Sequence, residues 1–284
     1  MKPVALDYVR AEGVEHTLDL LEEYGDDAKL LAGGQSLIPM LNLRLARPGV
    51  LIDISRVALD YVKQKEAFHL GALTKHRRLE FDESIRVNAP IFARCVRFIG
   101  HPAIRNRGTI GGSIAHADSR AELCVASVAA GASFVVESRS RGRRTIEAVD
   151  FFRGPFTTAI ESDEMLTEVL VPLPSADEVF HFEEVSERLG DFAVVAIAAR
   201  YAARDSQVAS PRLAIGGLGA CPVRLSTLET CLDGTSLGDW DSCGAEEALA
   251  QDLHSIGIRL NEKAYEVSLV RGLLFECFGV EPRP

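Results

Sequence analysis

The first 56 residues alternate between short apolar runs and turns rich in glycine and charged residues. The elements that this pattern predicts are a helix capped by Thr17 that runs through Tyr24, a buried strand over residues 29–32, a helical segment over 36–45 and a second strand over 50–54. Pro39 fits the helical segment only within its first turn, because proline has no backbone N–H to donate. The pattern therefore predicts a small α/β unit.

Residues 57–174 mix alternating and helical periodicity, and they end at Pro172 and Pro174. We expect strands over residues 67–73, 133–137, 144–148 and 164–171, and helices over 81–100 and 121–130. The two middle strands form a hairpin around Gly142, whereas residues 101–118 are punctuated by glycine and are expected to be irregular. The two prolines predict a domain boundary at residue 174.

Residues 175–284 begin with strand-like alternation and finish with helical periodicity. Strands over 179–185, 192–204 and 212–216 predict an antiparallel meander, and helices are expected over 225–232, 245–253 and 262–278. The predicted fold class is α+β. A two-part α/β domain over residues 1–174, with subdomains at about 1–56 and 57–174, precedes a three-stranded antiparallel sheet with a helical bundle over 175–284.

The composition is that of an ordinary folded protein, with 47% hydrophobic and 25% charged residues. Disordered and fibrous classes are therefore excluded. The 31 basic and 41 acidic residues give a net charge of −10, so we expect no nucleic-acid partner. No run approaches the roughly 20 apolar residues that span a bilayer, and the N-terminus lacks the apolar core of a secretion signal. We expect a cytoplasmic protein with no membrane span.

The cysteines and a run of arginines are the other compositional features that bear on chemistry. The 6 cysteines lack metal-ligand spacing, and at this length we expect reduced, mostly buried thiols rather than a disulfide framework or a metal site. Arg139, Arg141, Arg143 and Arg144 lie near the tip of the expected hairpin. We interpret them as a solvated face, with a subunit contact as the alternative.

Two glycine turns carry the strongest chemical signal. The first glycine turn (residues 30–37) follows a buried strand directly, and the second glycine turn (residues 107–113) lies in the irregular stretch. Successive backbone amides in such turns can hold phosphate oxygens, and Ser36, Thr109 and Ser113 can add hydroxyl donors. Two such turns suit a diphosphate held from both sides, whereas an ordinary tight turn is the alternative at each. Neither GxGxxG nor GxxxxGK[ST] is present at these turns.

Two longer motifs contain these turns. Ala-Gly-Gly-Gln-Ser-Leu-Ile-Pro-Met-Leu-Asn-Leu-Arg at 32–44 and Ile-Arg-Asn-Arg-Gly-Thr-Ile-Gly-Gly-Ser-Ile-Ala-His-Ala-Asp at 104–118 resemble the FAD-binding medium subunit of the molybdenum hydroxylases. This is the family of xanthine dehydrogenase and aerobic carbon monoxide dehydrogenase. Residues 190–193 and 222–224 resemble that family's C-terminal domain. The resemblance covers nearly the whole chain in order, and it implies a PCMH-type FAD-binding domain.

The resemblance also implies which residues contact FAD. The two glycine turns would enclose its diphosphate, Glu122 would hydrogen-bond FAD hydroxyls with Asp118 as a second candidate, and Leu166 would lie beside the isoalloxazine ring. The implied set is Leu30, Leu31, Ala32, Gly33, Gly34, Gln35, Ser36, Leu37, Ile99, Ile104, Thr109, Ile110, Gly111, Gly112, Ser113, Asp118, Glu122, Leu166, Asp191 and Phe192. Some relatives place a lysine at the position of Glu183, and that flavin contact cannot exist here. His101 and His116 are interpreted as structural.

The same resemblance implies electron transfer as the role. The expected partners are a large subunit that holds a molybdopterin cofactor and a small subunit that carries two [2Fe–2S] clusters, in a dimer of heterotrimers. FAD would pass electrons from the clusters to an external acceptor, and this chain would supply no catalytic residue and no metal ligand. Two alternatives are a free-standing FAD-dependent reductase on the same fold and a flavin-free scaffold subunit.

Overall fold

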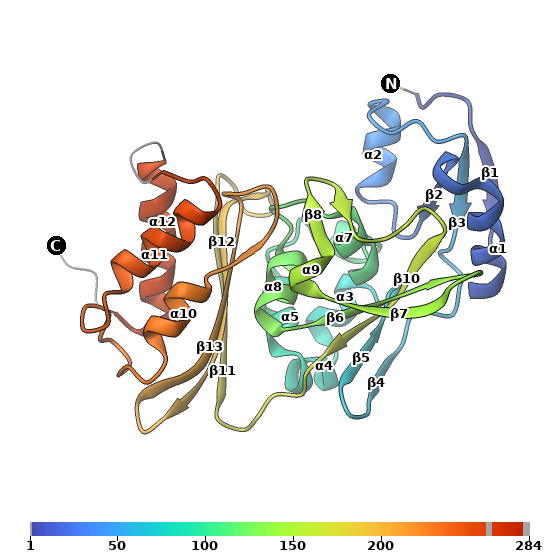
Figure 1. Cartoon of the computed structure of the whole chain (residues 1–284). Helices are drawn as coiled ribbons and strands as arrows, with labels where there is room; N and C mark the ends of the chain where they lie inside the picture. The colour runs from blue at the N-terminus through green and yellow to red at the C-terminus, as the bar shows by residue number, and fades with distance from the viewer. Residues whose placement is uncertain (1, 260–262, 281–284) are drawn as a thin grey trace.

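The computed structural model of the chain describes residues 2–259 and 263–280. Its elements form three groups side by side, each built around its own β-sheet (Figure 1). The group at the N-terminus has a parallel three-stranded sheet, the middle group a five-stranded sheet, and the C-terminal group a four-stranded sheet. A separate two-stranded ribbon, β8 (Phe152–Gly154) with β9 (Thr157–Thr158), lies near the middle group.

The N-terminal group confirms the predicted α/β unit. Its elements are β1 (Asp7–Arg10), α1 (Val14–Tyr24), a 3₁₀ turn (Gly25–Asp27), β2 (Ala28–Leu31), α2 (Leu37–Asn42) and β3 (Val50–Asp53), and the strand order is β1-β3-β2. Helix α1 begins at Val14, one turn before the predicted cap. Thr17 lies inside the helix, fully buried, and its hydroxyl donates to the carbonyl of Gly13. Strand β1 was not predicted, because it is a mostly exposed edge strand.

The middle group is a sheet in the order β4-β5-β10-β6-β7 with helices packed against it. Its elements are β4 (Val62–Gln64), β5 (Phe68–Gly71), α3 (His76–Phe81), α4 (Glu83–Asn88), α5 (Pro90–Cys95), α6 (Pro102–Arg105), α7 (Ile110–His116), α8 (Glu122–Ala130), β6 (Ser133–Ser138), β7 (Gly142–Glu147), α9 (Ala148–Phe151) and β10 (Glu164–Val171). The hairpin before Gly142 and the strand β10 are confirmed.

Two helical predictions in this group were wrong in detail. The expected helix over 81–100 is broken at Asp82, which caps the next helix through Ser84, and again before Pro90. Proline lacks the N–H that a continuous helix needs and restricts the residue before it. The stretch 101–118, expected to be irregular, contains the short helices α6 and α7, which begin at Pro102 and after the cap residue Thr109.

The C-terminal group confirms the meander and adds a short fourth strand. Its elements are β11 (Glu178–Ser186), β12 (Ala193–Arg204), β13 (Gln207–Gly216), β14 (Val223–Arg224), α10 (Ser226–Leu232), α11 (Ala245–Ser255) and α12 (Ala264–Phe278). The predicted start of the last helix, Glu262, lies outside the described residues. The helices cover one face of this sheet, and α8 of the middle group packs on the other (Figure 1).

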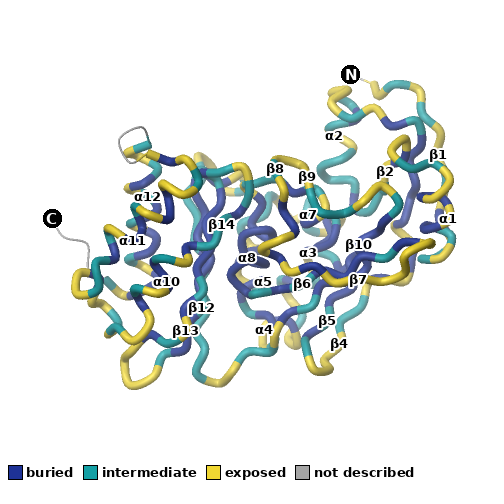
Figure 2. The backbone as a smooth tube through the Cα atoms, in the orientation of Figure 1, coloured by how far each residue is buried: buried dark blue, intermediate teal, exposed yellow. Residues whose placement is uncertain are grey.

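One hydrophobic core joins the middle and C-terminal groups. All nine residues of α8 are buried, and they cluster with Phe182, Ala196, Ala198 and Ala214 of the C-terminal sheet (Figure 2). The predicted boundary at residue 174 falls between β10 and β11, so this core includes residues from both sides of it. A second cluster lies between the C-terminal sheet and helices α10–α12, and a third fills the N-terminal group.

The cysteines and the arginine run differ from expectation. Cys231 and Cys243 form a disulfide between α10 and the segment before α11, so two of the six cysteines are not free thiols. Of the other four, Cys95, Cys124 and Cys277 are buried and Cys221 is partly buried. The expected disulfide framework is absent from the described residues, but this single bridge was not predicted because sequence alone cannot show which cysteines lie close together.

The arginine run is bound by carboxylates of the chain itself. Arg139 pairs with Glu15 and Asp19 of α1, and Arg143 pairs with Glu168 at 2.5 Å. Arg144 holds both oxygens of Glu164 at 2.7 Å, and the side chain of Glu164 is only 1% exposed. The run is therefore not only a solvated face, because it joins the hairpin to its neighbours.

We predict that Arg144→Ala lowers the free energy of unfolding by about 2 kcal/mol or more, because it leaves a buried carboxylate unpaired. Burial favours a raised pKa for Glu164, but hydrogen bonds from Arg144 and the Glu161 amide lower it overall. The stabilisation is therefore present at neutral pH and is lost as the pH falls through the lowered pKa. Arg139→Ala, which breaks exposed pairs only, should cost less than about 1 kcal/mol. Urea denaturation measures both, and equal losses would contradict the argument.

Candidate functional site

The two glycine turns lie against each other, backbone to backbone. A Cβ atom on Gly33 would overlap the carbonyl oxygen of Arg107 and would lie 3.0 Å from the α-carbon of Gly108. Gly34 has a φ of +73°, which strongly favours glycine. The side-chain amide of Gln35 donates to the carbonyl of Gly33 at 3.0 Å and stabilises the turn. The first turn follows β2, so the parallel sheet of the N-terminal group sets its position.

The first turn offers free backbone donors. No acceptor within the described residues takes the backbone N–H groups of residues 33–36. Four successive amides without partners, next to the Ser36 hydroxyl, form a concave donor surface that suits an anionic oxygen. This matches the role predicted for the first turn.

The second turn does not offer its amides in the same way. The N–H groups of Ile110 and Gly111 donate to the carbonyls of Thr74 and Ala72, and the N–H of Gly112 donates to the Thr109 hydroxyl at 3.1 Å. A Cβ on Gly111 would lie 2.6 Å from the Cβ of Ala72. The second turn is therefore packed into the protein, so a side chain at Gly111 would disturb the fold itself and not only a ligand.

A cleft of about 690 Å³ runs along both turns. Its volume lies within the usual range for sites that hold a cofactor. The predicted residues that line it are Leu30, Ala32, Gly33, Gly34, Gln35, Ser36, Leu37, Ile99, Ile104, Thr109, Gly111, Gly112, Ser113, Asp118, Glu122, Leu166, Asp191 and Phe192. Leu31 and Ile110 do not line it, and Ile110 is fully buried in the core. The structure thus brings residues from 30 to 192 into one cleft.

The C-terminal group closes one side of the cleft. The loop between β11 and β12 places Gly190 next to Gly100, where a Cβ on Gly190 would lie 3.1 Å from the Gly100 carbonyl oxygen. Phe192 follows on the cleft wall and remains 58% exposed. Glu183 does not line the cleft, and its pKa is raised by burial and by the charge of Glu276.

Several lining residues were missed from sequence. His76 is 5% exposed, and neither of its ring nitrogens has a hydrogen-bond partner in the described part of the chain. Burial lowers its pKa to about 4, so the ring is neutral at physiological pH. His116 also lines the cleft and stacks with Phe156, whose ring centroid is 5.0 Å away, whereas His101 is exposed and does not line it. No local pattern marked His76 or Phe156, because only the fold brings them here.

Glu122 supplies the most unusual carboxyl group of the cleft. It lies in the first turn of α8 and is 5% exposed. Burial, together with the nearby charges of Glu184 and Asp118, raises its pKa to about 8. At neutral pH the side chain is therefore a carboxylic acid, which can both donate and accept a hydrogen bond.

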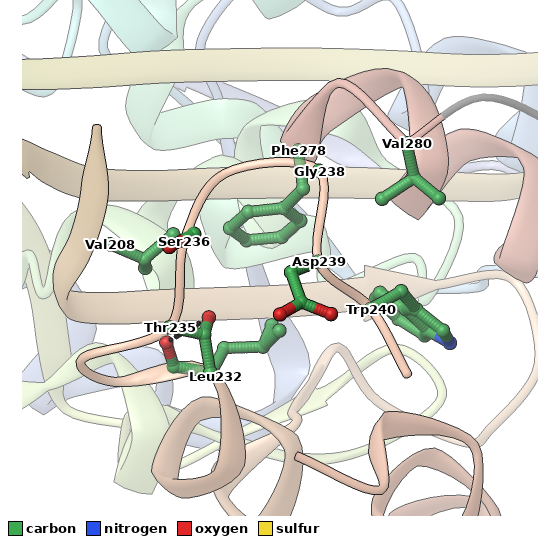
Figure 3. A pocket seen from close by; sticks show the side chains of 9 residues that line it. All are labelled: Val208, Leu232, Thr235, Ser236, Gly238, Asp239, Trp240, Phe278 and Val280. Atoms are coloured by element: carbon green, nitrogen blue, oxygen red, sulfur yellow. Dashed lines mark hydrogen bonds between the residues drawn. The ribbon is translucent and has the colours of Figure 1, made fainter. Parts of the chain in front are cut away.

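No other feature of the described residues competes with this cleft. A shallow depression in the C-terminal group, lined by nine residues that include Trp240, Phe278 and Asp239, leaves no space for even a water molecule (Figure 3). Within residues 2–259 and 263–280, no cluster of three potential metal ligands occurs, and no helix is long and apolar enough to cross a membrane.

Comparison with known proteins accounts for both halves of the chain. A family described as the FAD binding domain in molybdopterin dehydrogenase matches residues 4–174, and one described as the CO dehydrogenase flavoprotein C-terminal domain matches residues 180–279. The 6-hydroxypseudooxynicotine dehydrogenase complex subunit alpha of Paenarthrobacter nicotinovorans is 38% identical over 278 residues, which cover 96% of this chain and 93% of that one. Caffeine dehydrogenase subunit beta of a Pseudomonas strain is 36% identical over 84% of this chain and 82% of its own.

A solved structure agrees with these matches. A chain of carbon monoxide dehydrogenase from Hydrogenophaga pseudoflava superimposes with a TM-score of 0.85 at 33% identity, over 90% of this chain and 88% of that chain. The similarity includes both the glycine turns and the C-terminal group. The chain belongs to the family of FAD-binding medium subunits of the molybdenum hydroxylases, and it is the FAD-binding, electron-transferring component of an oxidoreductase complex.

Proposed function

We propose that the cleft holds one FAD without a covalent bond, with its diphosphate at the first glycine turn. The observation that carries this proposal is the row of four unpartnered amides at residues 33–36, which opens into a cleft large enough for a dinucleotide. In this proposal residues 1–174 are the FAD-binding domain, and the loop that contains Asp191 and Phe192 encloses the cleft from the C-terminal domain.

The residues of the cleft have distinct tasks in this proposal. The amides of the first turn bind the diphosphate, while the second turn, whose own amides are occupied, fixes the first by packing against Gly33. The neutral carboxyl of Glu122 exchanges hydrogen bonds with cofactor hydroxyls. Ile99, Ile104 and Leu166 provide an apolar surface that excludes water. The bound FAD supplies two-electron and one-electron redox chemistry, and the protein orients it.

We also propose a place for this subunit in a larger assembly. Relatives carry names such as nicotine 6-hydroxylase medium subunit and carbon monoxide dehydrogenase medium chain, which support a small [2Fe–2S] subunit and a large molybdopterin subunit as partners. A dimer of heterotrimers in the cytoplasm is the arrangement that we propose, because closed two-fold symmetry is the commonest for such complexes. Electrons would pass from the iron–sulfur clusters through FAD to an external acceptor.

The substrate of the complex is not written in this chain. Relatives that are 34–38% identical serve enzymes named for caffeine, nicotine, glyceraldehyde and carbon monoxide. A subunit that stays so similar across such different molecules handles electrons and not the organic substrate.

We predict that Gly33→Ala reduces FAD binding at least about tenfold, because the added methyl forces the first turn away from Arg107. Flavin fluorescence titration of the purified chain measures the affinity, and circular dichroism checks that the variant is folded. Gly272→Ala is the matched control, since a Cβ there meets nothing within 4 Å. Full affinity in a folded Gly33→Ala chain would contradict the role of the turn.

A second prediction separates the electron-transfer role from its alternatives. The chain alone, loaded with FAD, should not bleach its flavin when organic substrate is added, and turnover should appear only after the molybdenum and iron–sulfur subunits are restored. Substrate-dependent bleaching of the isolated subunit would favour a free-standing reductase. A purified complex that contains no flavin would favour the scaffold subunit.

A further inference from the structure

Glu122 lacks any hydrogen bond or ion pair that would stabilise a negative charge on its side chain. Within the described residues its carboxyl group has no side-chain donor and no cation as a partner, although the group is 5% exposed and lines the cleft. A buried carboxylate without donors is costly, and protonation removes that cost. The position therefore selects the neutral acid.

A second buried carboxyl group faces it from the other domain. Glu184 lies on β11, two residues from Phe182, so the two side chains share the face of the sheet that packs against α8. The Oε2 atom of Glu184 is buried and has no hydrogen-bond partner in the described structure. Two carboxyl groups without partners thus meet across the seam between α8 and the C-terminal sheet.

The two groups ionise in sequence. Burial raises the pKa of Glu184 to about 7, and its charge then adds to burial in raising the pKa of Glu122 to about 8. The other titratable groups near Glu122 are Asp118, which adds to the same repulsion, and the thiols of Cys95 and Cys124. Burial raises the pKa of both thiols well above the ordinary value, so they stay neutral where the two glutamates titrate.

We propose that Glu122 meets the cofactor as a neutral acid and that Glu184, a positioning residue of the C-terminal domain, sets the pH at which this acid ionises and releases the cofactor. The proposal rests on the proposed FAD site and adds a control to it. The neutral acid can donate a hydrogen bond to a cofactor oxygen, whereas the ionised form cannot donate and brings a second buried charge close to Asp118.

The sign of the effect follows from linkage. The cofactor binds the protonated form, so affinity is constant below the pKa of Glu122 and falls about tenfold per pH unit above it. Removing the charge of Glu184 makes Glu122 easier to ionise. The fall in affinity must then begin at a lower pH, which a merely structural role for Glu184 would not produce.

The test is a set of FAD titrations of the full chain, followed by flavin fluorescence between about pH 6 and about pH 10, a range that brackets both glutamates. Glu122→Gln keeps the shape and the donor of the neutral acid, so it should bind FAD like the unaltered chain at low pH and lose the decline at high pH. Glu184→Gln should keep the decline but shift its midpoint to lower pH. Glu183→Gln, on the same strand but on the opposite face, is the matched control and should leave the midpoint unchanged.

Three results would overturn the proposal: weak binding by Glu122→Gln at low pH, a flat profile in the unaltered chain, or an unmoved midpoint in Glu184→Gln. If the unaltered chain binds no FAD at any pH, the proposed FAD site fails, and the carboxyl titration itself still decides the inference. Carbon-13 NMR of glutamate side chains in the FAD-free chain should show a resonance titrating near pH 8 that is missing in Glu122→Gln and moved to lower pH in Glu184→Gln. A Glu122 resonance that titrates at the ordinary value for glutamate would exclude the neutral acid.

Discussion

The contact between the backbone of Gly33 and the Arg107–Gly108 peptide is the constraint on which the site depends. It joins the N-terminal sheet to the middle group at a distance that leaves no room for a side chain. The amide of His76 donates to the carbonyl of Gly108 on the other side of the same peptide, which fixes α3 there as well. The open amides of the first turn, the buried histidine and the walls of the cleft are all positioned relative to this one contact.

The sequence was sufficient for the parts of the fold that local pattern controls. Buried strands such as β2, β3 and β10 were predicted within a few residues, because short apolar runs between turn residues have few other interpretations. The two glycine motifs located most of the cleft. Local pattern was not sufficient where a single residue interrupts a longer periodicity, as Pro90 does in the expected helix over 81–100.

The site shows the same limit more sharply. Both turns carry Gly-Gly, yet one presents its amides to the cleft and the other uses them on Thr74 and Ala72. This difference arises from the neighbouring strand and not from the motif. Likewise, the neutral state of Glu122 depends on a carboxyl group 62 positions later in the chain. Such properties belong to the packed protein, so no reading of one segment can reveal them.

Helix α8 has a consequence for how this chain changes over evolutionary time. Its nine residues are buried because two sheets from different domains press on it, and the facing strand presents the small side chains of Ala196 and Ala198. A larger residue on either surface must be matched by a smaller one opposite. The two domains are therefore inherited as a matched pair, and a hybrid that joins an N-terminal half from one relative to a C-terminal half from another would carry a mismatched core beside its cofactor site.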